Sequence, residues 1–123
     1  MKWFLLILSG SIGTVARYIL SGAVYNMFGS RFPYGTLVVN LLGCFLIGFL
    51  TSISETKFLL TPNARLFLLI GFLGAFTTFS TFMLETADLI KIGQSWLAFW
   101  NVFLSLIIGF LIFRLGVLVG TMV

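Results

Sequence analysis

A cluster of hydroxyl side chains lies inside an apolar segment of this chain. Four of the five positions from 77 to 81 are Thr or Ser. Hydroxyls at this density can bond nearby backbone groups and compete with helical hydrogen bonds, and Gly71 and Gly74 weaken the turns before them. We therefore expect a broken helix here. Non-helical backbone at membrane depth is tolerated only where it is buried in protein or lines a polar cavity, so the break predicts an ion or solute site.

Other polar groups inside apolar segments favour an anion as the solute. Asn40, Asn101 and Arg17 are costly in a membrane span unless they find partners or water, so a functional role is expected. With the hydroxyls they form a set of neutral donors plus one positive charge. Phe79 and Phe82 lie three residues apart beside the break, and a phenyl ring presents a positive edge. Donors, ring edges and one cation suit an anion better than a cation.

The elements that must position these residues are membrane spans. Hydrophobic residues make up 60% of the 123 positions and charged residues 8%, and the mean hydropathy is +1.19. Each apolar stretch is long enough for the roughly 20 residues that cross a bilayer. We expect one all-α transmembrane domain, residues 1–123, with four helices and a broken third helix. The predicted spans are residues 3–24, 34–53, 65–90 and 96–119.

Smaller sequence signals concern helix ends and helix packing. Thr61 or Asn63 is expected to cap the third helix and Ser95 the fourth. Small residues recur at helical spacing, which favours close helix contacts in lipid. Gly10, Gly109, Gly116 and Gly120 are therefore interpreted as packing positions.

The sequence lacks the residues that several classes of function require. The chain has no histidine and a single cysteine, Cys44, so transition-metal catalysis and Ser/His/Asp hydrolysis are not expected, and we predict that it is not an enzyme. The net charge is +4, but the seven basic residues are scattered singly. The sequence has no basic patch, so nucleic acid is not expected as a partner.

The distribution of the basic residues bears on membrane orientation. If the four spans alternate, four basic residues lie toward one side of the membrane and three toward the other. Orientation follows the Lys/Arg bias, and a bias of one residue hardly selects a direction. Such a chain can insert both ways up, and an antiparallel dimer is then its natural assembly; the alternative is that another feature fixes one topology. The two sets are Lys2, Lys57, Arg65 and Arg114 against Arg17, Arg31 and Lys91.

Longer motifs resemble a known family. The segments are residues 13–18 (GTVARY), residues 35–40 (GTLVVN), residues 71–82 (GFLGAFTTFSTF) followed by Glu85 and Thr86, and residues 101–105. They are similar to the Fluc fluoride channels, also called CrcB-like, over nearly the whole chain. The resemblance implies an antiparallel, dual-topology homodimer in the cell (inner) membrane. It also implies two pores that pass fluoride out of the cytoplasm passively and with high selectivity.

The resemblance also implies roles for individual residues. Asn40 would donate to fluoride, and Phe79 and Phe82 would present ring edges to it. Gly74 and Thr77 would lend backbone carbonyls, two from each subunit, to a structural sodium ion at the dimer centre. Carbonyl oxygens suit such a hard cation. The remaining implied positions are the vestibule residue Arg17 and the pore residues Ser80, Thr81, Ser105 and Asn101, the last of which is tyrosine in some relatives.

Two alternatives stay open at this point. A small dual-topology multidrug antiporter has a similar length and number of spans, but its coupling requires a carboxylate in the membrane. The first span has no acid, so Glu85 and Asp88 are the only candidates. A structural subunit of a larger membrane complex would explain the glycines but not the Thr/Phe cluster.

Overall fold

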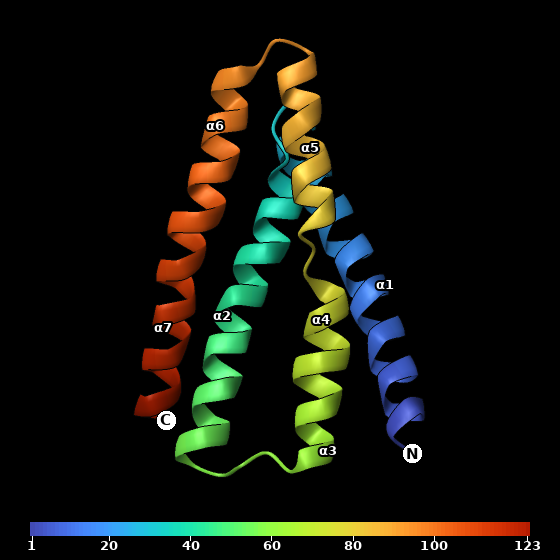
Figure 1. Ribbon diagram of the computed structural model, residues 1–123, viewed down its shortest axis with the longest axis vertical. Helices are drawn as coiled ribbons and strands as arrows, with labels where there is room; N and C mark the ends of the chain where they lie inside the picture. The colour runs from blue at the N-terminus through green and yellow to red at the C-terminus, as the bar shows by residue number, and fades with distance from the viewer.

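Helices joined by short connections make up the computed structural model, which describes residues 1–123 (Figure 1). The chain makes four passes along the long axis, alternately up and down, and both termini lie at the same end (Figure 1). The elements in order are α1 (Lys2–Phe28), α2 (Tyr34–Thr56), α3 (Pro62–Arg65), η1 (Leu66–Phe72), α4 (Leu73–Phe76), α5 (Ser80–Lys91), α6 (Ser95–Phe103), η2 (Leu104–Ile108) and α7 (Gly109–Met122), where η denotes a π-helical segment.

Four of the helical stretches are long and apolar enough to cross a membrane: Lys2–Phe28, Tyr34–Thr56, Pro62–Lys91 and Ser95–Met122. Each contains the predicted span, and helical hydrogen bonding continues a few residues beyond most of the predicted ends. The Thr61 cap is confirmed, since its hydroxyl accepts from the Ala64 N–H at 3.1 Å. The Ser95 cap was wrong, because Ser95 is the first residue of the helix and the N-cap position is Gln94, which makes no side-chain cap bond.

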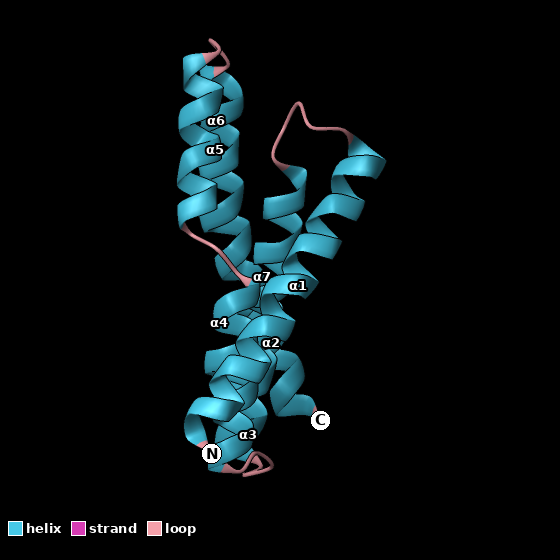
Figure 2. Cartoon of the chain, turned by 90° about the vertical axis from the view of Figure 1, so that its right-hand side faces the viewer, coloured by secondary structure: helices cyan, strands magenta, loops and turns pink.

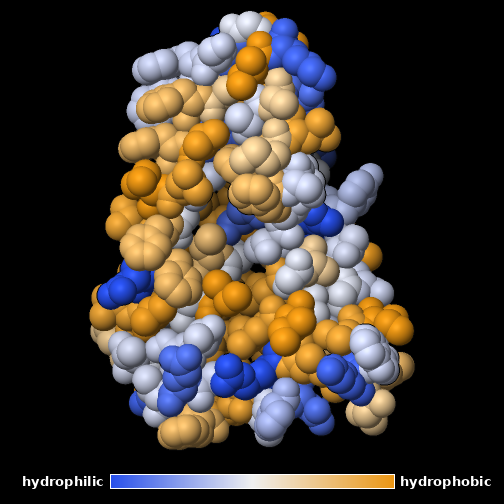
Figure 3. Space-filling view, viewed as in Figure 1, coloured by the Kyte–Doolittle hydropathy of each residue, from blue (hydrophilic) through white to orange (hydrophobic).

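The apolar residues face outward more than inward. Only 23 of the 123 residues are buried, so most large apolar side chains lie on the surface, and they cover much of the face in Figure 3. The small core consists of Val39, Leu73 and Phe76, at the contact of α2 with the third span. An exposed apolar surface around a small core is the arrangement that lipid, rather than water, stabilises.

Glycines let α2 and α7 approach closely. A Cβ at Gly116 would collide with the Phe45 carbonyl oxygen and lie 3.0 Å from the Phe49 nitrogen, and one at Gly120 would lie 2.7 Å from the Ser52 Cβ. These two packing predictions are confirmed. Gly10 does not fit the same prediction, because a Cβ there would meet nothing within 4 Å.

The predicted break in the third helix is confirmed. Helix α4 ends at Phe76 and α5 begins at Ser80. Before the break the third span packs against α1, where Gly71 of η1 makes room for the Ser9 side chain. Gly71 therefore serves a contact between α1 and the third span. After the break α5 packs against α6, and this pair leans away from the upper part of α1 (Figure 2).

We predict that Gly116→Ala destabilises the protein while Gly10→Ala does not. Both changes add one methyl group to a helix, but only the first places it against backbone atoms of α2 that cannot move independently. The expected loss is about 1–3 kcal/mol for Gly116→Ala, and the measurement is thermal unfolding of the purified proteins in detergent. Equal melting temperatures for the two variants would contradict the packing interpretation.

Candidate functional site

The non-helical segment from Thr77 to Phe79 is held by Asn40 of α2. The Asn40 Nδ2 donates to the Thr78 carbonyl oxygen, and the Thr78 N–H donates to the Asn40 Oδ1, both at 2.8 Å. One side-chain amide therefore satisfies both backbone groups of Thr78, which has left the helical ladder. A pair of bonds of this kind is what permits irregular backbone away from water.

The hydroxyls of the cluster bond locally, as their density predicted. The Thr77 Oγ1 donates to the Leu73 carbonyl at 3.0 Å, and Thr77 itself is extended, with ψ of 159°. The Thr78 Oγ1 accepts from the Thr81 N–H at 3.2 Å and lies 3.1 Å from the Thr81 Oγ1. The hydroxyls thus end one helix and begin the next.

A cavity of about 330 Å³ opens beside the break. It brings together six of the residues predicted for the site. Its wall combines apolar side chains with amide, hydroxyl and backbone groups. The six are Asn40, Gly74, Thr77, Phe79, Phe82 and Ser105.

Two of these residues are aromatic and one is a hydroxyl without a partner. The ring centroids of Phe79 and Phe82 are 5.7 Å apart and the ring planes are tilted by 57° to each other, so the edges of the two rings point in different directions. Phe79 is 68% exposed, whereas Phe82 is 5% exposed. The Ser105 Oγ, in the π-helical segment η2, is buried and has no hydrogen-bond partner in the chain. It is therefore free to donate to a bound solute.

A second cavity, of about 260 Å³, shares Thr78 with the first as a lining residue and contains Arg17. Hydroxyls make up most of its wall, and none of its lining residues is acidic. Arg17 forms no ion pair or side-chain hydrogen bond within the chain. Its charge is thus available to an anion that enters. The lining residues are Thr14, Arg17, Tyr18, Ser21, Thr36, Thr78 and Thr81.

Two predicted pore residues lie outside both cavities. Asn101 is 2% exposed, and its Nδ2 donates to the Thr86 Oγ1 at 2.9 Å, between α6 and α5. The Thr86 hydroxyl in turn donates to the Phe82 carbonyl at 2.8 Å. Asn101 therefore supports the helix that carries Phe82. Ser80 is exposed at the start of α5 and makes no side-chain hydrogen bond.

The backbone carbonyls of Gly74 and Thr77 fit the chemistry expected of a sodium site. The Thr78 N–H, which would ordinarily bond the Gly74 carbonyl in a helix, donates to Asn40 instead. Neither carbonyl accepts a hydrogen bond in the chain. Unpaired, partly negative carbonyl oxygens are suitable ligands for a hard cation.

Sequence reasoning missed three contacts that the fold creates. It named neither the pairing of Asn40 with Thr78 nor the contacts of Tyr25 with Glu85 and Thr36. The Tyr25 hydroxyl of α1 donates to the Glu85 Oε2 at 2.6 Å and lies 3.4 Å from the Thr36 Oγ1. Tyr25 and Glu85 are 60 positions apart, so no local spacing could have indicated them.

Comparison with known proteins identifies the family. The model of the family described as "CrcB-like protein, Camphor Resistance (CrcB)" matches residues 4–117. The chain belongs to the CrcB-like family. This assignment confirms the resemblance carried by the motifs.

Curated relatives of this CrcB-like chain are each named "Fluoride-specific ion channel FluC". The relative from Desulforapulum autotrophicum is 41% identical over 122 residues, which cover 99% of this chain and 98% of the relative. The relative from Magnetococcus marinus is 46% identical over 116 residues, 94% of each chain. The relative from Geobacter sp. (strain M21) is 49% identical over 100 residues, 81% of each chain. With its four apolar spans, the CrcB-like chain is a multi-pass membrane protein.

We predict that Asn40→Leu destabilises the fold, because it leaves the Thr78 N–H and carbonyl without partners at the break. The expected loss is roughly 2–6 kcal/mol, since each of the two buried orphan groups costs about 1–3 kcal/mol. Thermal unfolding measures the loss, and hydrogen exchange of the peptide that contains Thr78 should accelerate. Asn26→Leu is the control, because the Asn26 side chain is exposed and makes no hydrogen bond. Equal stability and equal exchange in the two variants would refute the role of Asn40.

Proposed function

We propose that this chain is a passive, selective fluoride channel that exports fluoride from the cytoplasm across the cell (inner) membrane. The single observation that carries the proposal is the chemistry beside the break. The two cavities there offer hydroxyls, the Asn40 amide, ring edges and the Arg17 charge, with no acidic side chain in either wall. The names of the relatives support fluoride as the ion.

The donors suit fluoride physically. Fluoride is a small, strongly hydrated anion and a very good hydrogen-bond acceptor, so a pore must replace its water with donors at close range. The buried Ser105 hydroxyl has no partner to give up before it donates to the ion. Chloride is larger and accepts more weakly, so it would gain less from the same lining.

No energy source other than the membrane potential is required. With about 100 mV negative inside, each exported anion gains roughly 2.3 kcal/mol from the field. The chain needs only to lower the barrier to crossing.

The proposed assembly is an antiparallel homodimer with two pores and a structural sodium ion at its centre. The break supports it, because Gly74 is exposed and Phe79 is 68% exposed beside the open cavity. A second copy would cover both. Sodium would be held by the Gly74 and Thr77 carbonyls of both copies, and would satisfy oxygens that have no other partner.

No observation favours the multidrug antiporter. The first span has no carboxylate, and Glu85 in the third span is bonded to Tyr25. A structural subunit would leave the donor-lined cavities without a role.

Fluoride efflux from liposomes that contain the purified protein tests the proposal, with chloride as the comparison ion. Ser105→Ala should reduce the fluoride rate by about tenfold, the effect of about 1.4 kcal/mol from one lost donor, while the melting temperature stays unchanged. Thr121→Ala is the control, because its hydroxyl bonds only its own helix near the C-terminus. A wild-type protein that carries no fluoride would overturn the function, and a normal rate in Ser105→Ala would remove that residue from the path.

Dual topology has its own test. Because the basic residues divide four to three, a reporter fused to the C-terminus should be detected on both sides of the membrane. Three lysines added after Val123 should produce a single orientation. One orientation only, in the unmodified chain, would count against the antiparallel dimer.

A further inference from the structure

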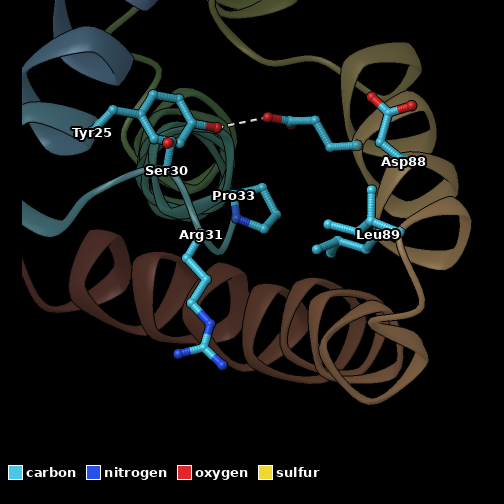
Figure 4. A pocket seen from close by; sticks show the side chains of 8 residues that line it. Tyr25, Ser30, Arg31, Pro33, Asp88 and Leu89 are labelled. Carbon is cyan, nitrogen blue, oxygen red and sulfur yellow. Dashed lines mark hydrogen bonds between the residues drawn. The ribbon is translucent and has the colours of Figure 1, made fainter.

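A third polar cavity, of about 300 Å³, lies toward the loop that joins α1 and α2. Tyr25, Glu85, Ser30, Arg31 and Asp88 are among its lining residues (Figure 4). It is separate from the Arg17 cavity, which lies beside the break. The two cavities share no lining residue, so polar groups that lie between them are of interest.

The group between them is the Tyr25 hydroxyl. On one side it lies 3.4 Å from the hydroxyl of Thr36, which lines the Arg17 cavity. On the other side it donates to Glu85, which lines the loop-side cavity, at 2.6 Å (Figure 4). A chain of three polar side chains thus runs from one cavity to the other.

The fold fixes the ring but leaves the hydroxyl bond replaceable. The ring packs on Gly35, where a Cβ would lie 2.7 Å from the Tyr25 Cδ2 and from the Ser21 carbonyl oxygen. The carboxylate depends on Tyr25 alone, since the Glu85 Oε1 is buried without a partner. The Arg31 side chain points away from the bond (Figure 4). One hydrogen bond therefore links α1 to α5 between the two cavities.

We propose that Tyr25 is a gate residue of the fluoride path, whose hydroxyl turns from Glu85 to an arriving fluoride ion and returns to Glu85 once the ion has passed. This inference rests on the proposed function. No covalent bond changes in the exchange, and Tyr25 keeps its proton throughout.

The exchange would discriminate between halides. A phenol held by a carboxylate is released only to an acceptor of comparable strength, because hydrogen bonds to charged acceptors are the stronger ones. Fluoride is such an acceptor and chloride is a weaker one. The Tyr25 gate would thus open to fluoride and stay closed to chloride.

Tyr25→Phe tests the gate, because it removes the hydroxyl and keeps the ring against Gly35. We expect fluoride efflux from liposomes to fall about tenfold or more. Tyr34→Phe is the matched control: it loses the same group at the same end of the molecule, but the Tyr34 ring pairs with Phe28 and Phe32 and its hydroxyl makes no hydrogen bond within the chain. A normal fluoride rate in Tyr25→Phe would overturn the gate.

Infrared spectroscopy tests the exchange without reference to transport. The chain has only three acidic side chains, so a difference spectrum against Glu85→Gln assigns the Glu85 carboxylate band. Sodium fluoride should shift this band in the wild type, in the direction that Tyr25→Phe shifts it, and sodium chloride should not. A band that fluoride leaves in place would overturn the exchange even if the protein conducts fluoride.

Glu85→Gln tests the same bond from the other side, and serves if Tyr25→Phe does not fold. A neutral amide oxygen holds the phenol less tightly than a carboxylate, so chloride should compete better for it. We expect the ratio of fluoride to chloride efflux to fall several-fold. An unchanged ratio would overturn the gate, whereas a wild-type protein without fluoride efflux would instead overturn the proposed function.

Discussion

The pairing of Asn40 with the backbone of Thr78 is the interaction on which the rest of the structure depends. A chain that leaves the helix inside a membrane must still satisfy its N–H and carbonyl groups. Asn40 satisfies both groups of one residue at 2.8 Å, and the nearby residues Gly74 and Thr77 line a cavity. Without this pair of hydrogen bonds, an unbroken helix would have the lower free energy, because it satisfies these backbone groups itself.

The break determines which helices become neighbours. Before it, the third span lies against α1, with Gly71 and Ser9 in close contact; after it, the chain turns to α6. The space left between the α5–α6 pair and the upper part of α1 holds polar side chains rather than an apolar core. Tight packing in one half of the molecule and polar cavities in the other are thus two results of a single interruption.

Local signals were readable from the sequence, and contacts between distant residues were not. The four spans, the break and the Thr61 cap depend on residues within a turn or two of each other. Six site residues met in one cavity as expected, but Asn101 proved to bond Thr86 rather than to line it. Glycine permits a close helix contact at position 116 but faces no neighbouring atom within 4 Å of an added Cβ at position 10. Only the fold decides which backbone lies opposite each glycine. The dimer and the sodium ion depend on a second copy and stay predictions.

The π-helical segment η2 allows one continuous helix to serve two partners. Before it, α6 contacts α5; after it, α7 contacts α2. A π-helical turn accommodates an extra residue, and each residue in a helix rotates the side-chain direction by about 100°. The side-chain directions at the two ends of the fourth span are thereby out of phase, and the span contains no proline. Evolution can in this way re-aim half of a helix by inserting a single amino acid, and leave the loops at both of its ends unchanged.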